Sequence, residues 1–226
     1  MGHGFTWFAS VGMHDTIATS IFVALLLIVF ALVASRRLAS ATASVEPEDG
    51  FTVRNLAEAF VEGIHGMAEG VIGHGSEKYV PLLGTFFAFI LVANLLGLVP
   101  GFSPPTSDFN ITFALGLVSF VAYNYYGARA HGAGYVKQFL GPMALLAPLM
   151  LLVEIFSHAF RPISLGIRLF ANMFADHQVV NIFTDLTKVG VPVIFYLLGT
   201  FVGVVQAFVF TMLTAIYIAL AISHDH

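Results

Sequence analysis

The chain contains no cysteine, and this absence excludes disulfides, thiol redox chemistry and thiolate metal sites. Charge is also scarce, because only 10% of the 226 residues are Asp, Glu, Lys or Arg, against about 25% in a soluble domain. The formal net charge is -4 and the sequence has no basic run, so we expect no nucleic-acid partner.

Motifs for several kinds of enzyme are missing too. The sequence has no H-E-x-x-H pair of a metalloprotease, no G-x-S-x-G turn of a serine hydrolase and no phosphate-binding loop. Its histidines are scattered without the spacing of metal ligands. We therefore expect a non-catalytic protein with no metal and no cofactor, which does not hydrolyse ATP by itself.

Apolar residues dominate what is present, at 58% of the chain. This composition is typical of an integral membrane protein, and several apolar runs are long enough for membrane helices. We expect an all-α integral membrane protein with about five membrane helices in a single membrane domain over residues 1–226. The expected membrane helices cover 17–35, 81–99, 109–126, 143–186 and 192–222.

Segment 51–72 differs from the expected spans because only one of its sides is apolar. Its periodicity predicts an amphipathic helix that lies along the membrane surface. Because the polar side is mainly acidic, water or another subunit is a better partner for it than anionic lipid. The apolar side carries Leu56, Phe60, Ile64, Met67 and Val71. The polar side carries Arg54, Glu58, Glu62, His65 and Glu69.

Basic residues predict the orientation of the chain. Arg36 and Arg37 directly follow the first expected span, which favours a cytoplasmic end there and an N-terminus outside. The loop 101–110 has no Lys or Arg and suits the outside, whereas Arg129 and Lys137 put the next loop inside. We find no convincing secretory signal and no transit signature, so we expect a multi-pass protein of a bacterial inner membrane.

The last two apolar segments are too long to stand upright in a bilayer. Segment 143–186 has 44 residues. As one helix it would measure about 66 Å, against a hydrocarbon core of roughly 30 Å. Segment 192–222 would measure about 46 Å. The first segment either splits at Arg161-Pro162, which puts the C-terminus outside, or both helices tilt steeply, which puts it inside.

Segment 143–186 also carries a polar stripe. At about 100° per residue, eight polar residues fall on one side of the helix if Pro162 does not disturb the register, while His177 points away. Ionisable groups inside a membrane are typical of ion pathways, relays and counter-charges. The stripe consists of Glu154, Ser157, His158, Arg161, Ser164, Arg168, Asn172 and Asp176.

Two plainer interpretations of the arginines stay open at this point. Arg168 could form a structural ion pair with Asp176 or Glu154. The serines and the asparagine favour a water-accessible face, because a simple ion pair does not need them. Arg161 could lie at the interface and extend its head to water.

The last expected helix offers a surface for close helix packing. Gly199, Gly203 and Gln206 share one face, and small residues let another helix approach closely. We expect Gln206 to meet that helix as a buried hydrogen-bonding group.

The motifs "RPISLGIRLFANM" and "VQAFVFTMLTAIYI" resemble subunit a of rotary F-type ATP synthases. "FILVANLLGLVPGF" and "PPTSDFNITFAL" are similar to earlier helices of that family, so the likeness runs from about residue 51 to the C-terminus. The usual family pattern is RLFGN, whereas this chain has RLFAN, with Ala171 in place of glycine.

The resemblance implies a stator that faces a ring of c subunits in the lipid bilayer. Two aqueous half-channels would lead protons to and from a carboxylate on each c subunit, and so couple proton flow to rotation and ATP synthesis. It implies peripheral-stalk b subunits as further partners and an indirect link to the soluble catalytic sector. It also favours one long tilted helix over 143–186 and a cytoplasmic C-terminus.

The resemblance further implies roles for eight residues. Arg168 matches the essential arginine of the family, and Gln206 matches the glutamine opposite it. Where many relatives carry His or Glu, seven residues before the glutamine, this chain has Gly199, and His177 or Asp176 are candidates to replace that group. The outer half-channel would contain Asn94, Asp176 and His177. The inner half-channel, or the region between the two, would contain Glu154, Ser164 and Asn172.

A secondary transporter is the competing interpretation. Such proteins often consist of inverted repeats with broken helices, and the two halves of this sequence show no repeat. A stator subunit should copurify in mild detergent with a c-ring and a peripheral stalk, whereas a transporter should come alone or as a homo-oligomer.

Overall fold

The computed structural model describes residues 14–40, 52–99, 101–132, 147–187 and 190–223. Within these ranges the chain is almost entirely helical and has no strand, which confirms the all-α fold. Two short 3-10 helices, η2 (Ser76–Lys78) and η3 (Pro105–Ser107), join the longer elements. The α-helices are α1 (Asp15–Ser40), α2 (Val53–Ile72), α3 (Val80–Leu96), α4 (Phe109–His131), α6 (Ala147–Leu186) and α7 (Val191–Ile222).

Three helices of the described chain are long and apolar enough to cross a membrane, namely α1, α4 and α7. The apolar helix α3 is shorter. α6 spans 40 residues and carries the charged groups of the polar stripe. These helices confirm an all-α membrane protein. The loop residues 133–146, with Lys137, and the linker 41–51 lie outside the described residues.

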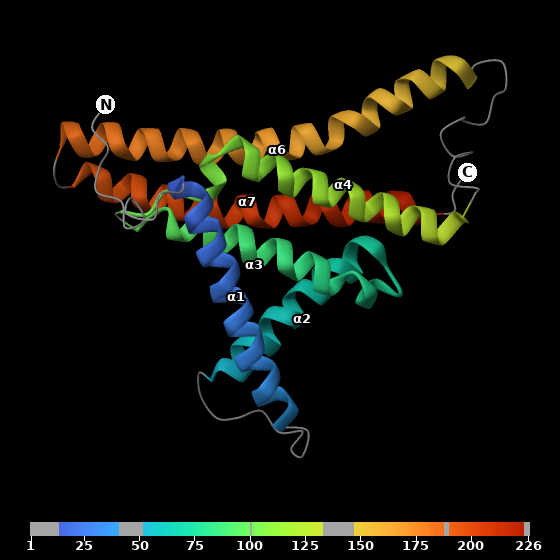
Figure 1. The fold of residues 1–226 in the computed structure, drawn as a ribbon, viewed down its shortest axis with the longest axis horizontal. Coiled ribbons are helices and arrows are strands. Elements are labelled where there is room, and N and C mark those ends of the chain that lie inside the picture. The colour runs from blue at the N-terminus through green and yellow to red at the C-terminus, as the bar shows by residue number, and fades with distance from the viewer. Residues whose placement is uncertain (1–13, 41–51, 100, 133–146, 188–189, 224–226) are drawn as a thin grey trace.

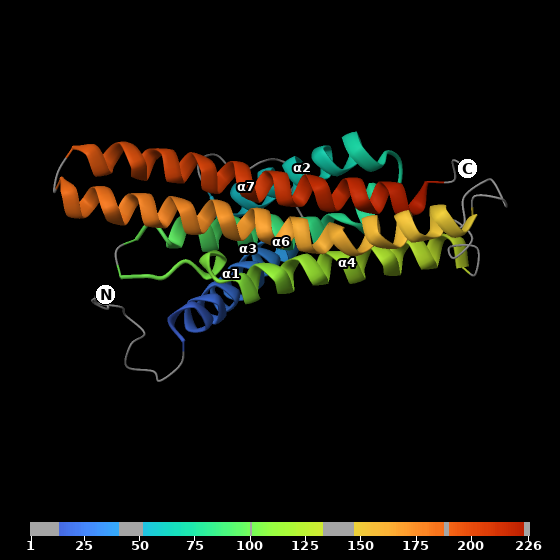
Figure 2. The same ribbon diagram turned by 90° about the horizontal axis from the view of Figure 1, so that it is seen from above.

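Helices α3, α4, α6 and α7 run side by side along the long axis of the molecule (Figures 1 and 2). α1 crosses the direction of this group at a large angle (Figure 1). A membrane that α1 crosses upright therefore holds α6 and α7 steeply tilted, which suits their lengths of 40 and 32 residues. This arrangement agrees with the expected tilt of the last two helices.

α6 is one continuous α-helix through Pro162, so the alternative of a split at this residue is wrong. Proline removes one backbone hydrogen bond and favours a bend, and the N-terminal part of α6 slants away from the bundle in Figure 1. Close packing on α4 supports the helix here. A Cβ added to Gly116 would lie 2.5 Å from the carbonyl oxygen of Pro162, and one added to Gly166 would lie 3.0 Å from Cα of Phe113. The two glycines permit this contact.

The bundle has two apolar centres. The first joins α3, α6 and α7. Leu165, Leu169 and Met173 recur every four residues, so they lie on one side of α6, and this side is buried against α3 and α7. The second joins α2 to α3, α4 and α7. The first contains Phe86, Ile90, Leu165, Leu169, Met173, Ala207 and Phe210. The second contains Ile64, Ala68, Leu83, Tyr123, Ala215, Ile218 and Ala221.

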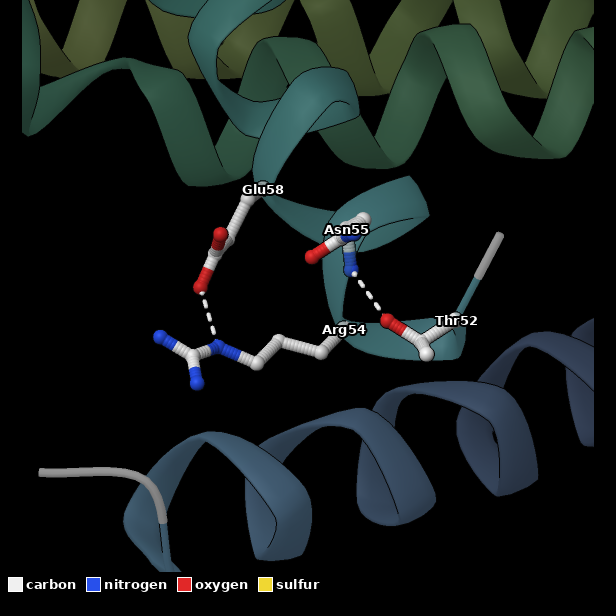
Figure 3. A network of polar contacts seen from close by, with 4 residues as sticks. All are labelled: Thr52, Arg54, Asn55 and Glu58. Carbon is white, nitrogen blue, oxygen red and sulfur yellow. Dashed lines mark hydrogen bonds and ion pairs between the residues drawn. The ribbon is translucent and has the colours of Figure 1, made fainter. Parts of the chain in front are cut away.

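The amphipathic helix α2 packs much of its apolar side on α3 and α7. At its start the Thr52 hydroxyl accepts a hydrogen bond from the backbone N–H of Asn55, as an N-cap does. Arg54 was expected on the polar side, but its side chain is buried between α2 and α1 and donates to Glu58 Oε1 at 2.7 Å (Figure 3). The sequence pattern missed this burial because it could not foresee that α1 passes beside the first turn of α2.

Candidate functional site

Arg168 lies on the outward side of α6, beside the row of buried leucines that faces the bundle. Its side chain is exposed and has no hydrogen-bond or ion-pair partner among the described residues. The structural ion pair considered for Arg168 is therefore not formed. Glu154 instead lies 3.9 Å from the guanidinium of Arg161.

Asn172 links this outward side of α6 to α7. Its Nδ2 donates a hydrogen bond of 2.6 Å to Oε1 of Gln206. The Gln206 side chain is buried, with 4% of its surface exposed, and its Nε2 has no partner among the described groups. Gln206 thus meets a neighbouring helix as a buried hydrogen-bonding group, as the sequence predicts, and that helix is α6.

Gly199 makes room for a carboxylate. A Cβ added to Gly199 would overlap the side-chain oxygens of Asp176 on α6. Asp176 is half-buried at this contact and makes no hydrogen bond or ion pair with described residues. His177 follows directly and is also half-buried. The structure therefore places the carboxylate of Asp176, on α6, directly beside Gly199 on α7, where α7 itself has no side chain.

Gly203 has a different neighbour from Gly199. A Cβ added to Gly203 would lie 3.2 Å from Cβ of Asn94 on α3. The Asn94 side chain is only 1% exposed, and its amide nitrogen donates to the carbonyl of Gly203 at 2.9 Å. Its amide oxygen accepts from the Thr106 hydroxyl at 2.7 Å. Asn94 therefore joins α3, η3 and α7, and both ends of its amide are occupied.

The polar stripe of α6 divides into an outward part and an inward edge. Ser164, Arg168 and Asn172 are exposed, and the Ser164 hydroxyl donates to the carbonyl of Arg161 within its own helix. His158 belongs to the inward edge, where its Nε2 lies 2.8 Å from Oδ1 of Asn124 on α4. Periodicity alone could not separate these two parts, because it does not show which neighbouring helix covers which edge.

Arg161 is held by protein groups on the inward edge. Its guanidinium lies 5.3 Å from the ring centre of Tyr217 and 6.0 Å from that of Tyr123, besides its contact with Glu154. Both ring distances are within the range of cation–π attraction. This environment differs from the expected alternative in which Arg161 extends to the membrane interface. Sequence reasoning missed Tyr123, Tyr217 and Asn124, and the polar run at 123–126 in an apolar helix was the available signal.

Among the described residues Arg168 thus has no counter-charge, and it lies on the outer surface of the bundle beside a hydroxyl and two amides. Exposed apolar side chains surround this stripe, among them Ile167, Phe174 and Phe201. A guanidinium in such surroundings can stabilise an anion that arrives from outside the chain.

Comparison with known proteins identifies the family. The sequence model described as "ATP synthase A chain" matches residues 17–219. ATP synthase subunit a of Bdellovibrio bacteriovorus is 42% identical over 227 aligned positions, which cover 100% of this chain and 95% of that protein. The subunits a of Solibacter usitatus and Sorangium cellulosum are 41% and 44% identical over 90% and 87% of this chain, and 84% and 79% of their own lengths. This chain belongs to the family of ATP synthase subunit a, a membrane subunit of that complex.

Proposed function

We propose that this chain is the stator of a proton-driven rotary ATP synthase, with Arg168 as the group that separates two aqueous half-channels and interacts with the rotor. The observation that carries the proposal is that Arg168 is exposed, without a counter-charge among the described residues, on the outward side of α6. A structural arginine in a membrane protein would have its partner within the fold. The partner of Arg168 is the carboxylate of each passing c subunit.

Arginine suits this task because its guanidinium stays protonated even when it is partly buried, whereas a lysine could lose its proton. A permanent cation favours the ionised form of a neighbouring carboxylate and so promotes release of its proton. The same fixed charge blocks protons from passing directly between the half-channels. A c carboxylate must be neutral to turn through lipid, because burying its charge is costly. Each proton then contributes about 2.3 kcal/mol per 100 mV of membrane potential.

The outer half-channel in this proposal leads along α6 to the contact of Asp176 with Gly199. The carboxylate of Asp176, with His177 beside it, provides the exchangeable groups that Gly199 cannot. Asn94 has both amide ends engaged, so it holds Gly203 and Thr106 beside this path rather than passing a proton itself.

The inner half-channel contains Glu154 and Ser164, both on the part of α6 before Arg168. Between the two paths, the hydrogen bond from Asn172 to Gln206 fixes α6 against α7 beside Arg168. Because the Gln206 oxygen is occupied and its Nε2 is buried, this amide acts on the rotor site through Asn172 and the packing of α6 on α7 rather than by direct contact.

The c-ring is the direct partner in this proposal, and it faces the stripe around Arg168. Peripheral-stalk b subunits hold the stator, and the soluble catalytic sector is coupled only through them and the rotor. The chain lies in a bacterial inner membrane with its N-terminus outside and its C-terminus in the cytoplasm.

The test is proton-driven ATP synthesis in membranes that carry Arg168→Ala, with Arg161→Lys, which keeps the positive charge beside Glu154, as the control on the same helix. We expect Arg168→Ala to reduce synthesis by at least about 100-fold, because a preorganised charge on the reacting group is lost. The control should retain most of its activity. Synthesis near the wild-type rate with Arg168→Ala would show that Arg168 is a structural charge and would overturn the proposal.

A further inference from the structure

A groove of about 570 Å³ lies between α1, α3 and α4 and shares none of the proposed proton-pathway residues. Its walls are largely apolar, with Ile17 and Ile21 from α1, Phe89 from α3, and Leu115 and Val118 from α4. α1 and α4 are both candidate membrane spans, and Val118 is 52% exposed. The groove therefore lies in the part of the molecule that meets hydrocarbon rather than water.

One end of the groove is polar. His14, just before α1, and Asp108 and Asn110, at the start of α4, line it there, while Ser20 lines the groove further along α1. The Thr16 hydroxyl donates to Asp108 Oδ2 at 3.1 Å and so ties the first turn of α1 to the start of α4. Further along, α1 departs from the direction of α4 (Figure 1). The groove is thus a wedge with a polar end where the helices are tied and apolar walls where they diverge.

Asp108 gives the polar end a negative character. No Lys or Arg lines the groove, and Asp108 forms no ion pair within the described ranges. The hydrogen bonds that its carboxylate accepts come from the Thr16 hydroxyl and from the backbone and side-chain N–H groups of Asn110, all of them neutral donors. A carboxylate at a membrane surface without a cation is complementary to a ligand that brings an ammonium group.

We infer that this groove binds a bilayer phospholipid whose headgroup carries a primary ammonium, as in phosphatidylethanolamine. An acyl chain fills the apolar wedge and the ammonium donates to Asp108. The Asn110 side-chain amide, which uses one N–H on Asp108, offers its second N–H to the phosphate. Among the described residues that line the groove, an anionic headgroup finds no Lys or Arg, and a quaternary ammonium has no N–H to donate.

The first test measures lipid retained by the intact synthase complex in nanodiscs with equal amounts of phosphatidylethanolamine and phosphatidylglycerol of identical chains. Asp108→Asn removes the charge and keeps the N-cap of α4, because Asn caps helices about as well as Asp. We expect mass spectrometry to show a preference for phosphatidylethanolamine that falls by about fivefold in this variant, the loss of one charge-assisted hydrogen bond. Asp185→Asn, at an exposed position near the end of α6, is the matched control and should leave the preference unchanged.

A second pair of variants tests the apolar wedge. Ala24 lines the groove, so Ala24→Trp should displace the bound chain. Leu25 is 56% exposed and does not line the groove, so Leu25→Trp should retain the lipid. A photoreactive residue at Val118 then identifies the occupant. Adducts with phosphatidylethanolamine are expected. Equal retention of both lipids in wild type, no effect of Asp108→Asn and Ala24→Trp, or adducts mainly with a polypeptide would each overturn the inference.

Discussion

Arg161 and Arg168 lie two turns apart on α6 and differ in their partners. Arg161 has a carboxylate at 3.9 Å and two tyrosine rings within 6.0 Å. Arg168 has no ion pair or hydrogen bond with the described residues. The same side chain on the same helix is thus part of the packing at one position and available to another molecule at the next. The difference teaches that partners within the fold, rather than residue type, separate a structural charge from a candidate functional one.

The largest expected effect comes from replacing Arg168 by lysine. Lysine keeps a positive charge in water, but it can lose its proton beside a carboxylate in a site of low polarity and it lacks the planar fork of arginine. We expect proton-driven ATP synthesis to fall by at least about 100-fold in Arg168→Lys. Arg161→Lys, measured in the same membranes, is the control. Activity of Arg168→Lys above half of wild type would remove the distinction between the two arginines.

A smaller effect is expected where α7 leaves space for Asp176. The Cβ of Gly199→Ala would overlap the carboxylate, so Asp176 must move or the helices must separate. We expect synthesis to fall by about tenfold and the complex to lose roughly 1–3 kcal/mol of stability from overpacking. Adding Asp176→Ala should restore the thermal stability but not the synthesis rate. Recovery of both would mean that Asp176 only fills space.

The hydrogen bond between His158 and Asn124 should affect stability more than transport. Replacing Asn124 by leucine leaves a buried imidazole with one partner fewer, at a cost of about 1–3 kcal/mol. Thermal unfolding of the isolated complex measures this loss, and synthesis per folded complex should change by less than about twofold. A fall in synthesis without any loss of stability would move His158 from the packing into the proton pathway.

The smallest effect is expected for Arg161→Lys. The ammonium keeps the charge beside Glu154 but loses part of the attraction to the rings of Tyr123 and Tyr217, about 0.5–1 kcal/mol. The transition temperature of the complex should fall slightly while synthesis stays near the wild-type rate. A strong loss of synthesis in this variant would give both arginines a role in transport, and Arg161 would no longer be a purely structural charge.

Much of the fold could be predicted from the apolar periodicity. The last helix was expected over 192–222 and is observed as Val191–Ile222, because an uncharged run of that length has no other stable state in lipid. The continuity of α6 could not be derived from its residues, because Pro162 permits either a break or a bend. The close contact with α4 at Gly116 and Gly166 accompanies the bend, and it depends on residues far apart in the sequence.

The candidate site was predicted in its residue types but not in its pairings. Helical periodicity placed eight polar residues on one side of α6. It could not show that α4 and α7 cover His158 and Arg161 but leave Arg168 exposed. Gly199 and Gly203 were expected to admit one helix and instead meet two, α6 through Asp176 and α3 through Asn94. Such pairings depend on how the helices cross, which periodicity within one helix does not contain.

The most direct test of the central claim is passive proton conductance through the membrane sector after the catalytic sector has been removed, compared in wild type, Arg161→Lys and Arg168→Ala. If Arg168 is the barrier between two half-channels, Arg168→Ala should conduct protons at least as fast as wild type while its ATP synthesis is lost. Arg161→Lys, which keeps the charge beside Glu154, should match wild type in both measurements. Two results for Arg168→Ala would contradict the account. One is a loss of proton conductance because the complex no longer assembles, and the other is ATP synthesis that continues near the wild-type rate.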